Sequence, residues 1–241
     1  MKFAAHPPTD GNLCRFFKIP EDFSHKIADS LSLEEAVLVE PLSVAVHAVR
    51  LAGLRPGQNV LVQGSGTIGL LVAAMAKAVG SSNVFVADIQ ENKLDFAKSF
   101  TNCVTFVPDL TSMPEGEAER FKKVMNMLNG VDVVLECTGV ESSAQTGLHV
   151  LTAGGVFVQI GMGKPEQKLP ILTMCEKEII LKTSFRYGPG DYEAALDLLQ
   201  SGAISVKALI SNTVPFHRAA EAWEMTRRGD GIKNLIEGIR D

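Results

Sequence analysis

The sequence predicts an α/β fold in which a doubly wound parallel sheet is covered by helices on both faces. From position 59 onward, short runs rich in β-branched residues alternate with helical stretches. These runs lack the polar alternation of a half-exposed strand, as expected for strands buried on both faces. Such a strand–helix repeat is typical of parallel sheets. The expected strands are 59–63, 83–87, 103–107, 131–135, 156–160 and 178–183, and the expected helices are 68–79, 92–100, 115–128 and 142–151.

The N-terminal part has a different character from this repeat. Residues 1–31 are rich in Pro, Asp, Asn and Phe, and we expect loops with short extended pieces there. Ser32 and Glu35 have the spacing of a capping box, which satisfies free amides at the start of a helix. A longer helix is expected over 42–51, leading into the first strand.

The C-terminal part is expected to contain one more helix and a last strand. Phe216, Ala219, Ala220 and Trp223 fall on one face of a helix, which predicts that Trp223 is a core residue. The final apolar run, 235–239, reads as a strand.

Composition and charge disfavour several classes of protein. The chain has 241 residues, a net charge of −5 and no basic stripe, so nucleic acid and anionic lipid are not favoured as partners. No apolar stretch is long enough for a signal peptide or a membrane span. The four cysteines lie far apart without a CxxC pair, which favours reduced thiols in a cytoplasmic protein over disulfides or a structural zinc site. They are Cys14, Cys103, Cys137 and Cys175.

A glycine-rich turn joins the first strand of the repeat to its first helix. Gly64, Gly66 and Gly69 have the spacing G-x-G-x-x-G. The first glycine permits a tight turn, the second lets the backbone approach a pyrophosphate, and the third lets helix and strand pack closely. The free amides of the helix N-terminus then attract the anion. Asp88 lies 19 residues beyond Gly69, at the end of the next strand, so the sequence predicts a Rossmann-type dinucleotide site.

Asp88 also indicates which dinucleotide is bound. A carboxylate there accepts hydrogen bonds from the ribose hydroxyls and repels a 2′-phosphate, which favours NAD over NADP. Lys93 lies one helical turn further on and is either an adenosine contact or a solvated charge. A methyltransferase that uses S-adenosylmethionine would also have a glycine turn and an acidic residue on these strands. The third glycine fits a dinucleotide site better.

Several stretches resemble the zinc-dependent medium-chain alcohol dehydrogenases. They are VEPLSVAVHAVRLAG (39–53), PGQNVLVQGSGTIG (56–69), DVVLECTG (132–139) and VQIGMG (158–163). Three more are similar to the polyol branch, the sorbitol and xylitol dehydrogenases, namely PPTDGNLCRFF (7–17), Glu40-Pro41 and SFRYGPGDYEAAL (184–196). The resemblance covers nearly the whole chain. It implies reversible, NAD-dependent oxidation of a polyol to a ketose, of the L-iditol 2-dehydrogenase or D-xylulose reductase type.

The resemblance implies further cofactor-binding residues beside the three glycines. Ile68, Asp88 and Lys93 would contact the adenosine and pyrophosphate half of NAD. A second set follows two later strands and would line the nicotinamide, largely through the backbone. Its members are Ile160, Gly161, Met162, Ser184, Phe185 and Arg186.

The resemblance also implies substrate-binding residues. Arg186 and Tyr187 would reach the polyol hydroxyls, and Glu40 would lie beside the catalytic metal, touching the substrate or metal-bound water. Glu40 would thus serve in catalysis as well as in substrate binding. From the residues alone, Glu40 is equally a helix-start carboxylate that interacts with the helix dipole.

The zinc ligands of the family are the part that this sequence does not repeat. Family members have a cysteine ligand, a Gly-His-Glu motif and often four closely spaced cysteines in a preceding half, and none of these motifs occurs here. His47 lies on an apolar helix and is expected to pack rather than to bind metal. The chain is therefore expected to be truncated at its N-terminus, with no metal ligand of its own. Because zinc stabilises the charge that develops on the alcohol oxygen, we expect this chain alone to bind NAD but to oxidise polyols poorly or not at all.

Three segments and two rival functions complete the prediction. Residues 1–39 are expected to be a remnant of a GroES-like β domain, 40–204 the NAD-binding domain, and 205–241 a segment that returns to the catalytic domain. The expected partners are a small polyol or ketose and further copies of the chain in a homo-oligomer. The alternatives are a non-catalytic NAD-binding protein or subunit, and a zinc-free reductase of the quinone or enoyl type, which the NADP-opposing Asp88 disfavours.

Overall fold

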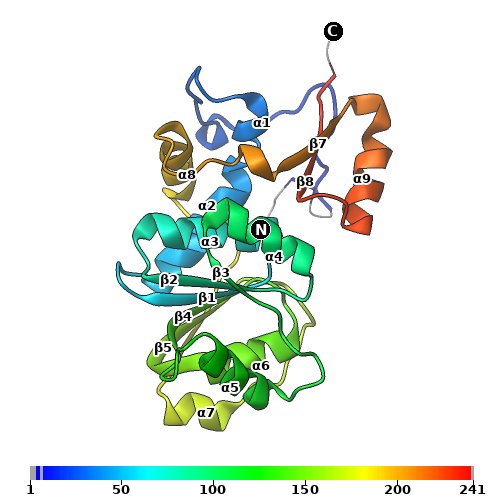
Figure 1. Cartoon of the computed structure of the whole chain (residues 1–241). Helices are drawn as coiled ribbons and strands as arrows, with labels where there is room; N and C mark the ends of the chain where they lie inside the picture. Colours follow the sequence, from blue (N-terminus) through cyan, green and yellow to red (C-terminus); the bar gives the residue numbers. More distant parts are fainter. Residues whose placement is uncertain (1–3, 6–7, 240–241) are drawn as a thin grey trace. The chain divides into compact units, whose positions relative to one another are not determined.

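Six parallel strands form one sheet in the order β3–β2–β1–β4–β5–β6 (Figure 1). This computed structural model describes residues 4–5 and 8–239. The strand order reverses between β1 and β4, and in open α/β sheets a ligand crevice lies at the carboxyl ends of the strands at such a point. The strands are β1 (Asn59–Gln63), β2 (Asn83–Ala87), β3 (Val104–Phe106), β4 (Val131–Glu136), β5 (Leu151–Gln159) and β6 (Ile180–Thr183).

Helices cover both faces of this sheet, as the buried strands require. Figure 1 shows α2, α3 and α4 on one face and α5, α6 and α7 on the other. Helix α8 packs beside α2. The bounds are α2 (Val39–Ala52), α3 (Thr67–Val79), α4 (Glu91–Thr101), α5 (Pro114–Val124), α6 (Glu141–Val150), α7 (Ile171–Glu176) and α8 (Asp191–Gln200).

An aromatic cluster lies in the core between the sheet and helix α5. The ring of Phe121 meets those of Phe85 and Phe106 edge-on, with centroid distances of 5.4 and 5.1 Å. Edge-to-face contacts of this kind add to the stability that burial alone provides. Leu61 and Phe157 are fully buried in the same cluster, so the predicted apolar runs do form the centre of the fold.

The structure confirms the predicted doubly wound parallel sheet but moves some boundaries. Helix α5 ends at Val124, four residues earlier than predicted, because Asn126 takes a left-handed conformation (φ 54°). Strand β5 begins at Leu151, whereas the sequence predicts its start at position 156. Its pairing with β4 is irregular between Leu151 and Val156, and Gly154 there has a left-handed backbone (φ 71°). Regular pairing therefore resumes at Val156, the predicted start of the strand. Helices α7 and α8 are not among the predicted helices.

The chain divides into two compact units, Leu38–Ser205 and a smaller unit formed by the residues up to Val37 and from Val206. The sequence places these boundaries at 40 and 204. In the smaller unit, strands β7 (Ile210–Val214) and β8 (Lys233–Ile236) pair in parallel and are joined through helix α9 (Ala219–Arg228). The assignment of this unit to a GroES-like domain stays a prediction.

The capping box at the start of helix α1 (Leu33–Ala36) is confirmed. The Ser32 hydroxyl oxygen accepts from the Glu35 amide at 3.2 Å, and the Ser32 amide donates to the Glu35 carboxylate at 3.3 Å. Lys207 adds an ion pair to Glu35 at 3.8 Å. Within the described part of 1–31, only a short 3-10 helix at Glu21–Phe23 interrupts the loops, and no strand is formed.

The prediction that Trp223 is a core residue is wrong. Its side chain is 61% exposed, and in helix α9 the buried residue is the neighbouring Ala222. Phe216 lies before α9, in a separate 3-10 helix (Phe216–Arg218). The small sheet of β7 and β8 presents too little surface to cover the large ring of Trp223, which follows the buried Ala222. Among the described residues, no helix is both long and apolar enough to cross a bilayer.

Candidate dinucleotide site

The glycine turn after β1 has a separate geometric reason for each glycine. Gly64 has a left-handed backbone (φ 96°), which glycine adopts without strain. At Gly69, an added Cβ would lie 1.9 Å from the Gly64 carbonyl oxygen, so only glycine lets α3 pack against the end of β1. At Gly66, no atom lies within 4 Å of an added Cβ. The residue at the start of α3 therefore has open space beside it, as a pyrophosphate-binding turn requires.

Asp88 lies at the end of β2 with its carboxylate fixed against this turn. One oxygen accepts hydrogen bonds from the amide and the hydroxyl of Ser65, both at 2.8 Å. The other accepts from the Gln90 amide at 3.0 Å. Since a carboxylate has about four acceptor positions, Asp88 keeps capacity for a ribose hydroxyl. The sequence reasoning missed Ser65, whose only signal is its place between the first two glycines.

A cavity of about 670 Å³ opens at the carboxyl ends of the strands, within the size range of small-molecule sites. Of the predicted residues, Gly64, Gly66, Asp88 and Lys93 line it. Lys93 therefore lies at the cavity, and its role as an adenosine contact stays a prediction. Ile68 does not line the cavity; it lies in the first turn of α3 and is half-buried.

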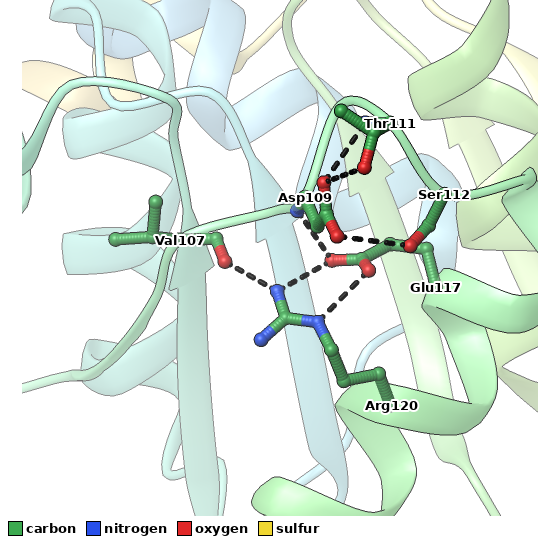
Figure 2. A network of polar contacts seen from close by, with 6 residues as sticks. All are labelled: Val107, Asp109, Thr111, Ser112, Glu117 and Arg120. Atoms are coloured by element: carbon green, nitrogen blue, oxygen red, sulfur yellow. Dashed lines mark hydrogen bonds and ion pairs between the residues drawn. The ribbon is translucent and has the colours of Figure 1, made fainter.

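One wall of the cavity is a loop after β3 that a polar network holds in place (Figure 2). Glu117 accepts two hydrogen bonds from the Arg120 guanidinium, at 2.7 and 2.9 Å, and one from the Asp109 amide at 2.9 Å. Arg120 also donates to the Val107 carbonyl. Hydrogen bonds from Thr111 hold the pKa of the Asp109 carboxyl below its usual range. The loop is thus tied to helix α5 by its own backbone.

The end of β4 contains a buried carboxylate that the sequence reasoning did not single out. Glu136 is fully buried. It accepts hydrogen bonds from the Thr138 amide and hydroxyl, from the Gly139 amide at 2.8 Å and from the Gln159 side chain at 2.8 Å. A buried charge is stable only when it is paired or hydrogen-bonded in this way. Its signal in the sequence is an acid that directly follows the apolar run 133–135 at the end of β4.

The backbones after β4 and β5 lie in close contact beside Glu136. An added Cβ at Gly161 would come within 2.2 Å of the Gly139 amide nitrogen. The amides of Ile160 and Gly161 both donate to the Glu136 carbonyl at 2.8 Å. The next side chain, Met162, is 82% exposed. Backbone hydrogen bonds therefore hold Ile160 and Gly161, two of the three residues predicted to line the nicotinamide here. The side chain of the third, Met162, extends into solvent.

The residues after β6 continue the same edge of the sheet. The Ser184 amide donates to the Gln159 carbonyl at 2.8 Å, and its hydroxyl is buried with no hydrogen-bond partner in the structure. Phe185 is half-exposed, and the Arg186 guanidinium lies 5.7 Å from the centre of its ring. Arg186 has a left-handed backbone (φ 56°), which is strained for a residue other than glycine.

The predicted substrate-binding residues gather around a pair of tyrosines. The rings of Tyr187 and Tyr192 meet edge-on with centroids 4.8 Å apart. Burial first, and then the hydrogen bond with Tyr187 and the charges of Tyr187 and Glu40, raise the pKa of Tyr192 well above its usual value. Glu40 lies in the first turn of α2. The structure thus brings Tyr187 against Tyr192, a side chain that the sequence reasoning missed, and the charges of Glu40 and Arg186 act on the same phenol.

His47 lies on α2 and pairs with Asp191, at 2.8 Å from Nδ1 to the carboxylate. Within the described ranges 4–5 and 8–239, no three His, Cys, Asp or Glu side chains lie close enough together to hold a metal ion. The donor groups described here do not supply a zinc ligand set.

Known proteins were compared with this chain. A family model described as Zinc-binding dehydrogenase matches residues 67–201. A relative named Probable D-xylulose reductase A, from Neosartorya fischeri, is 48% identical over 241 residues, which are 100% of this chain and 67% of the relative. The structure of L-idonate 5-dehydrogenase from Escherichia coli matches with a TM-score of 0.84 and 29% identity, over 97% of this chain and 65% of that one. A protein described as a zinc-binding dehydrogenase from Sinorhizobium meliloti, solved with NADP, matches with a TM-score of 0.77 and 26% identity, over 89% of this chain and 62% of that one.

The sheet order, the glycine turn and the acid after β2 define a Rossmann-type nucleotide-binding domain of an oxidoreductase. The chain belongs to the zinc-binding dehydrogenase family, whose members use NAD or NADP. It spans about two thirds of the length of these relatives. The resemblance to the polyol branch is confirmed, because relatives at nearly half identity are named D-xylulose reductases.

Two glycine variants separate packing from ligand access. In Gly69→Ala the added methyl meets the Gly64 carbonyl, so we expect the free energy of unfolding to fall by about 2 kcal/mol or more. Gly66→Ala, which meets nothing, is expected to stay within ~0.5 kcal/mol but to weaken NADH binding about tenfold, a loss of ~1.4 kcal/mol. Thermal unfolding and NADH fluorescence titration measure these effects. Equal melting temperatures in the two variants would contradict the packing argument.

The raised pKa of Tyr192 predicts a loss of stability in alkali. The unfolded chain ionises this phenol near pH 10, while the folded protein keeps it neutral to higher pH. Its stabilising contribution is therefore complete below pH 10 and is lost as the pH rises further. Urea unfolding between pH 8 and 11 should show a steeper decline in the wild type than in Tyr192→Phe. Parallel declines would show that Tyr192 is not the group responsible.

Proposed function

We propose that this chain is the nucleotide-binding and substrate-facing part of an NAD-dependent polyol dehydrogenase that interconverts a polyol such as xylitol with its ketose. The observation that carries the cofactor assignment is the Asp88 carboxylate, held by Ser65 beside the open Gly66. The substrate class is supported by relatives named D-xylulose reductase.

The residues at the carboxyl ends of the strands fit a dinucleotide. The start of α3, beside the open space at Gly66, would bind the diphosphate through its backbone, and Asp88 would accept a hydrogen bond from the adenosine ribose. The buried, unpartnered hydroxyl of Ser184 supports a polar group of the nicotinamide side binding at the end of β6. When bound, NAD accepts a hydride from the alcohol carbon. Gly161 is fixed by its contact with Gly139, and its backbone would form one side of the nicotinamide site.

The substrate-facing residues would orient the polyol rather than activate it. Arg186 and Tyr187 can donate hydrogen bonds to hydroxyl groups, and Glu40 can accept one. Their grouping around Tyr192 supports this role. A polyol presents several neighbouring hydroxyls, so a site with both donors and an acceptor suits it better than it suits an apolar alcohol.

The choice between NAD and NADP is tested with Asp88→Ser. We expect the wild type to bind NADH at least about tenfold more tightly than NADPH, and the variant to lose most of this preference, because the carboxylate repels the 2′-phosphate. The control is Asp95→Ser, which removes the same charge from an exposed position on α4. Fluorescence titration with each coenzyme measures the affinities. Tighter binding of NADPH by the wild type would overturn the proposal.

Turnover is tested in both directions, with NAD and xylitol and with NADH and D-xylulose. The prediction from the sequence, slow oxidation by this chain alone, stays open until this is measured. Activity that rises with added zinc and disappears with a chelator supports the dehydrogenase. Tight NADH binding with no turnover under any of these conditions favours the alternative of a non-catalytic NAD-binding subunit.

Location and assembly follow as parts of the same proposal. Cys14, Cys103, Cys137 and Cys175 are all free thiols, which supports a reducing compartment such as the cytoplasm. Strand β6 lies at the edge of the sheet and pairs with β5 alone among the described strands, and its Ile180 is half-exposed. An edge strand of this kind supports a homo-oligomer joined along β6.

A further inference from the structure

Asp191 is a buried carboxylate with partners from two separate parts of the nucleotide-binding unit. Its side chain is 3% exposed. It accepts from His47 Nδ1 at 2.8 Å, from Arg50 Nη1 at 2.5 Å and from the Gly188 amide at 2.7 Å. His47 and Arg50 belong to α2, while Gly188 belongs to the loop that precedes α8. One side chain therefore joins this loop to helix α2.

The loop that Asp191 holds is the segment 184–190, between β6 and α8. It contains two left-handed residues, Arg186 (φ 56°) and Gly190 (φ 80°). The first is a strained conformation that persists only where surrounding contacts impose it. The hydrogen bond from Gly188 to Asp191 lies between these two residues and supplies such a contact. The start of the loop is also held by the hydrogen bond from the Ser184 amide to the Gln159 carbonyl of β5, so Asp191 fixes the part of the loop that lies next to α8.

The side of α2 that receives Asp191 is also the side that carries Glu40. His47 follows Glu40 by seven residues, which is close to two helical turns, so the two side chains lie on one face. Tyr192, the residue after Asp191, senses the charge of Glu40. The pairing of Asp191 with His47 and Arg50 therefore joins the loop before α8 to the helix that carries Glu40.

We propose that Asp191 is a positioning residue, which locks the loop 184–190 onto helix α2 so that Arg186 and Tyr187 face Glu40 across the polyol site. The proposal rests on the proposed function for the identity of the ligand. His47 and Arg50 are the two donors on α2 that hold Asp191. This gives His47 a role distinct from metal binding. A purely structural acid would stabilise α8 without setting the order of the loop.

The test compares Asp191→Asn with Asp197→Asn in the full chain. Asp197 is an exposed acid on the same helix, so the control changes the same charge without touching the loop. Hydrogen exchange by mass spectrometry reports on the loop. Near-ultraviolet circular dichroism reports on the tyrosines, because the two in this chain, Tyr187 and Tyr192, both lie at this site.

In Asp191→Asn we expect the loop amides to exchange about tenfold faster or more, and the tyrosine dichroism to fall. NADH affinity should fall by no more than about threefold, because Asp88 and the glycine turn, which would bind the adenosine and pyrophosphate half, lie outside this loop. The control should match the wild type in all three measurements. His47→Gln, which keeps the Arg50 and Gly188 contacts, should show a smaller change of the same kind and serves if Asp191→Asn does not fold. Unchanged loop exchange in both variants would overturn the proposal, as would faster exchange spread evenly over α2, α3 and α8.

The measurements with polyol are interpreted separately from the measurements of loop order. If the wild type turns over xylitol, Asp191→Asn should raise KM for the polyol about tenfold and KM for NAD by clearly less, because the glycine turn and Asp88 lie outside the loop. Equal effects on both constants would overturn the positioning role. If the wild type has no turnover, the polyol function fails, while the exchange and dichroism results still decide whether Asp191 orders the loop.

Discussion

The structure depends on the close packing of helix α3 against the end of strand β1. The Gly64 carbonyl lies where the side chain of residue 69 would be, so the approach requires glycine. This contact holds the start of α3 at the carboxyl end of the sheet, and the Ser65 amide just before α3 donates to Asp88 at the end of β2. The site for a dinucleotide is therefore made first by the main chain, and side chains then select among its ligands.

A similar arrangement repeats on the other side of the strand-order reversal. Gly139 and Gly161 let the segments after β4 and β5 touch, and the buried carboxylate of Glu136 gathers the amide and hydroxyl groups of this contact. Removing any of these donors would leave a buried charge less well satisfied, which is costly. The backbone predicted to bound the nicotinamide is thus held by an acid at the centre of the sheet.

The sequence predicts the sheet and the glycine turn because their signals are local. Buried parallel strands read as apolar runs, and Gly69 is followed by Asp88 at a fixed spacing along the chain. The partners of Ser65 and Asp191 could not be predicted, since these partners come from positions 23 and 141 or 144 residues away. The prediction that Trp223 is buried is wrong for a related reason. An amphipathic pattern shows which residues share a face, but not how much surface is available to cover that face.

The loop after β3, which forms one wall of the cavity (Figure 2), links ligand binding to local unfolding of the nucleotide-binding unit. Glu117 and Arg120 tie this wall to helix α5, and Phe121 of the same helix packs between Phe85 and Phe106. A molecule that occupies the cavity of the native state, and not the unfolded chain, shifts the folding equilibrium by mass action. Because the wall and the aromatic cluster share one helix, occupancy at the surface suppresses the fluctuations that would expose the rings. A bound coenzyme would thereby also stabilise the aromatic core of the protein.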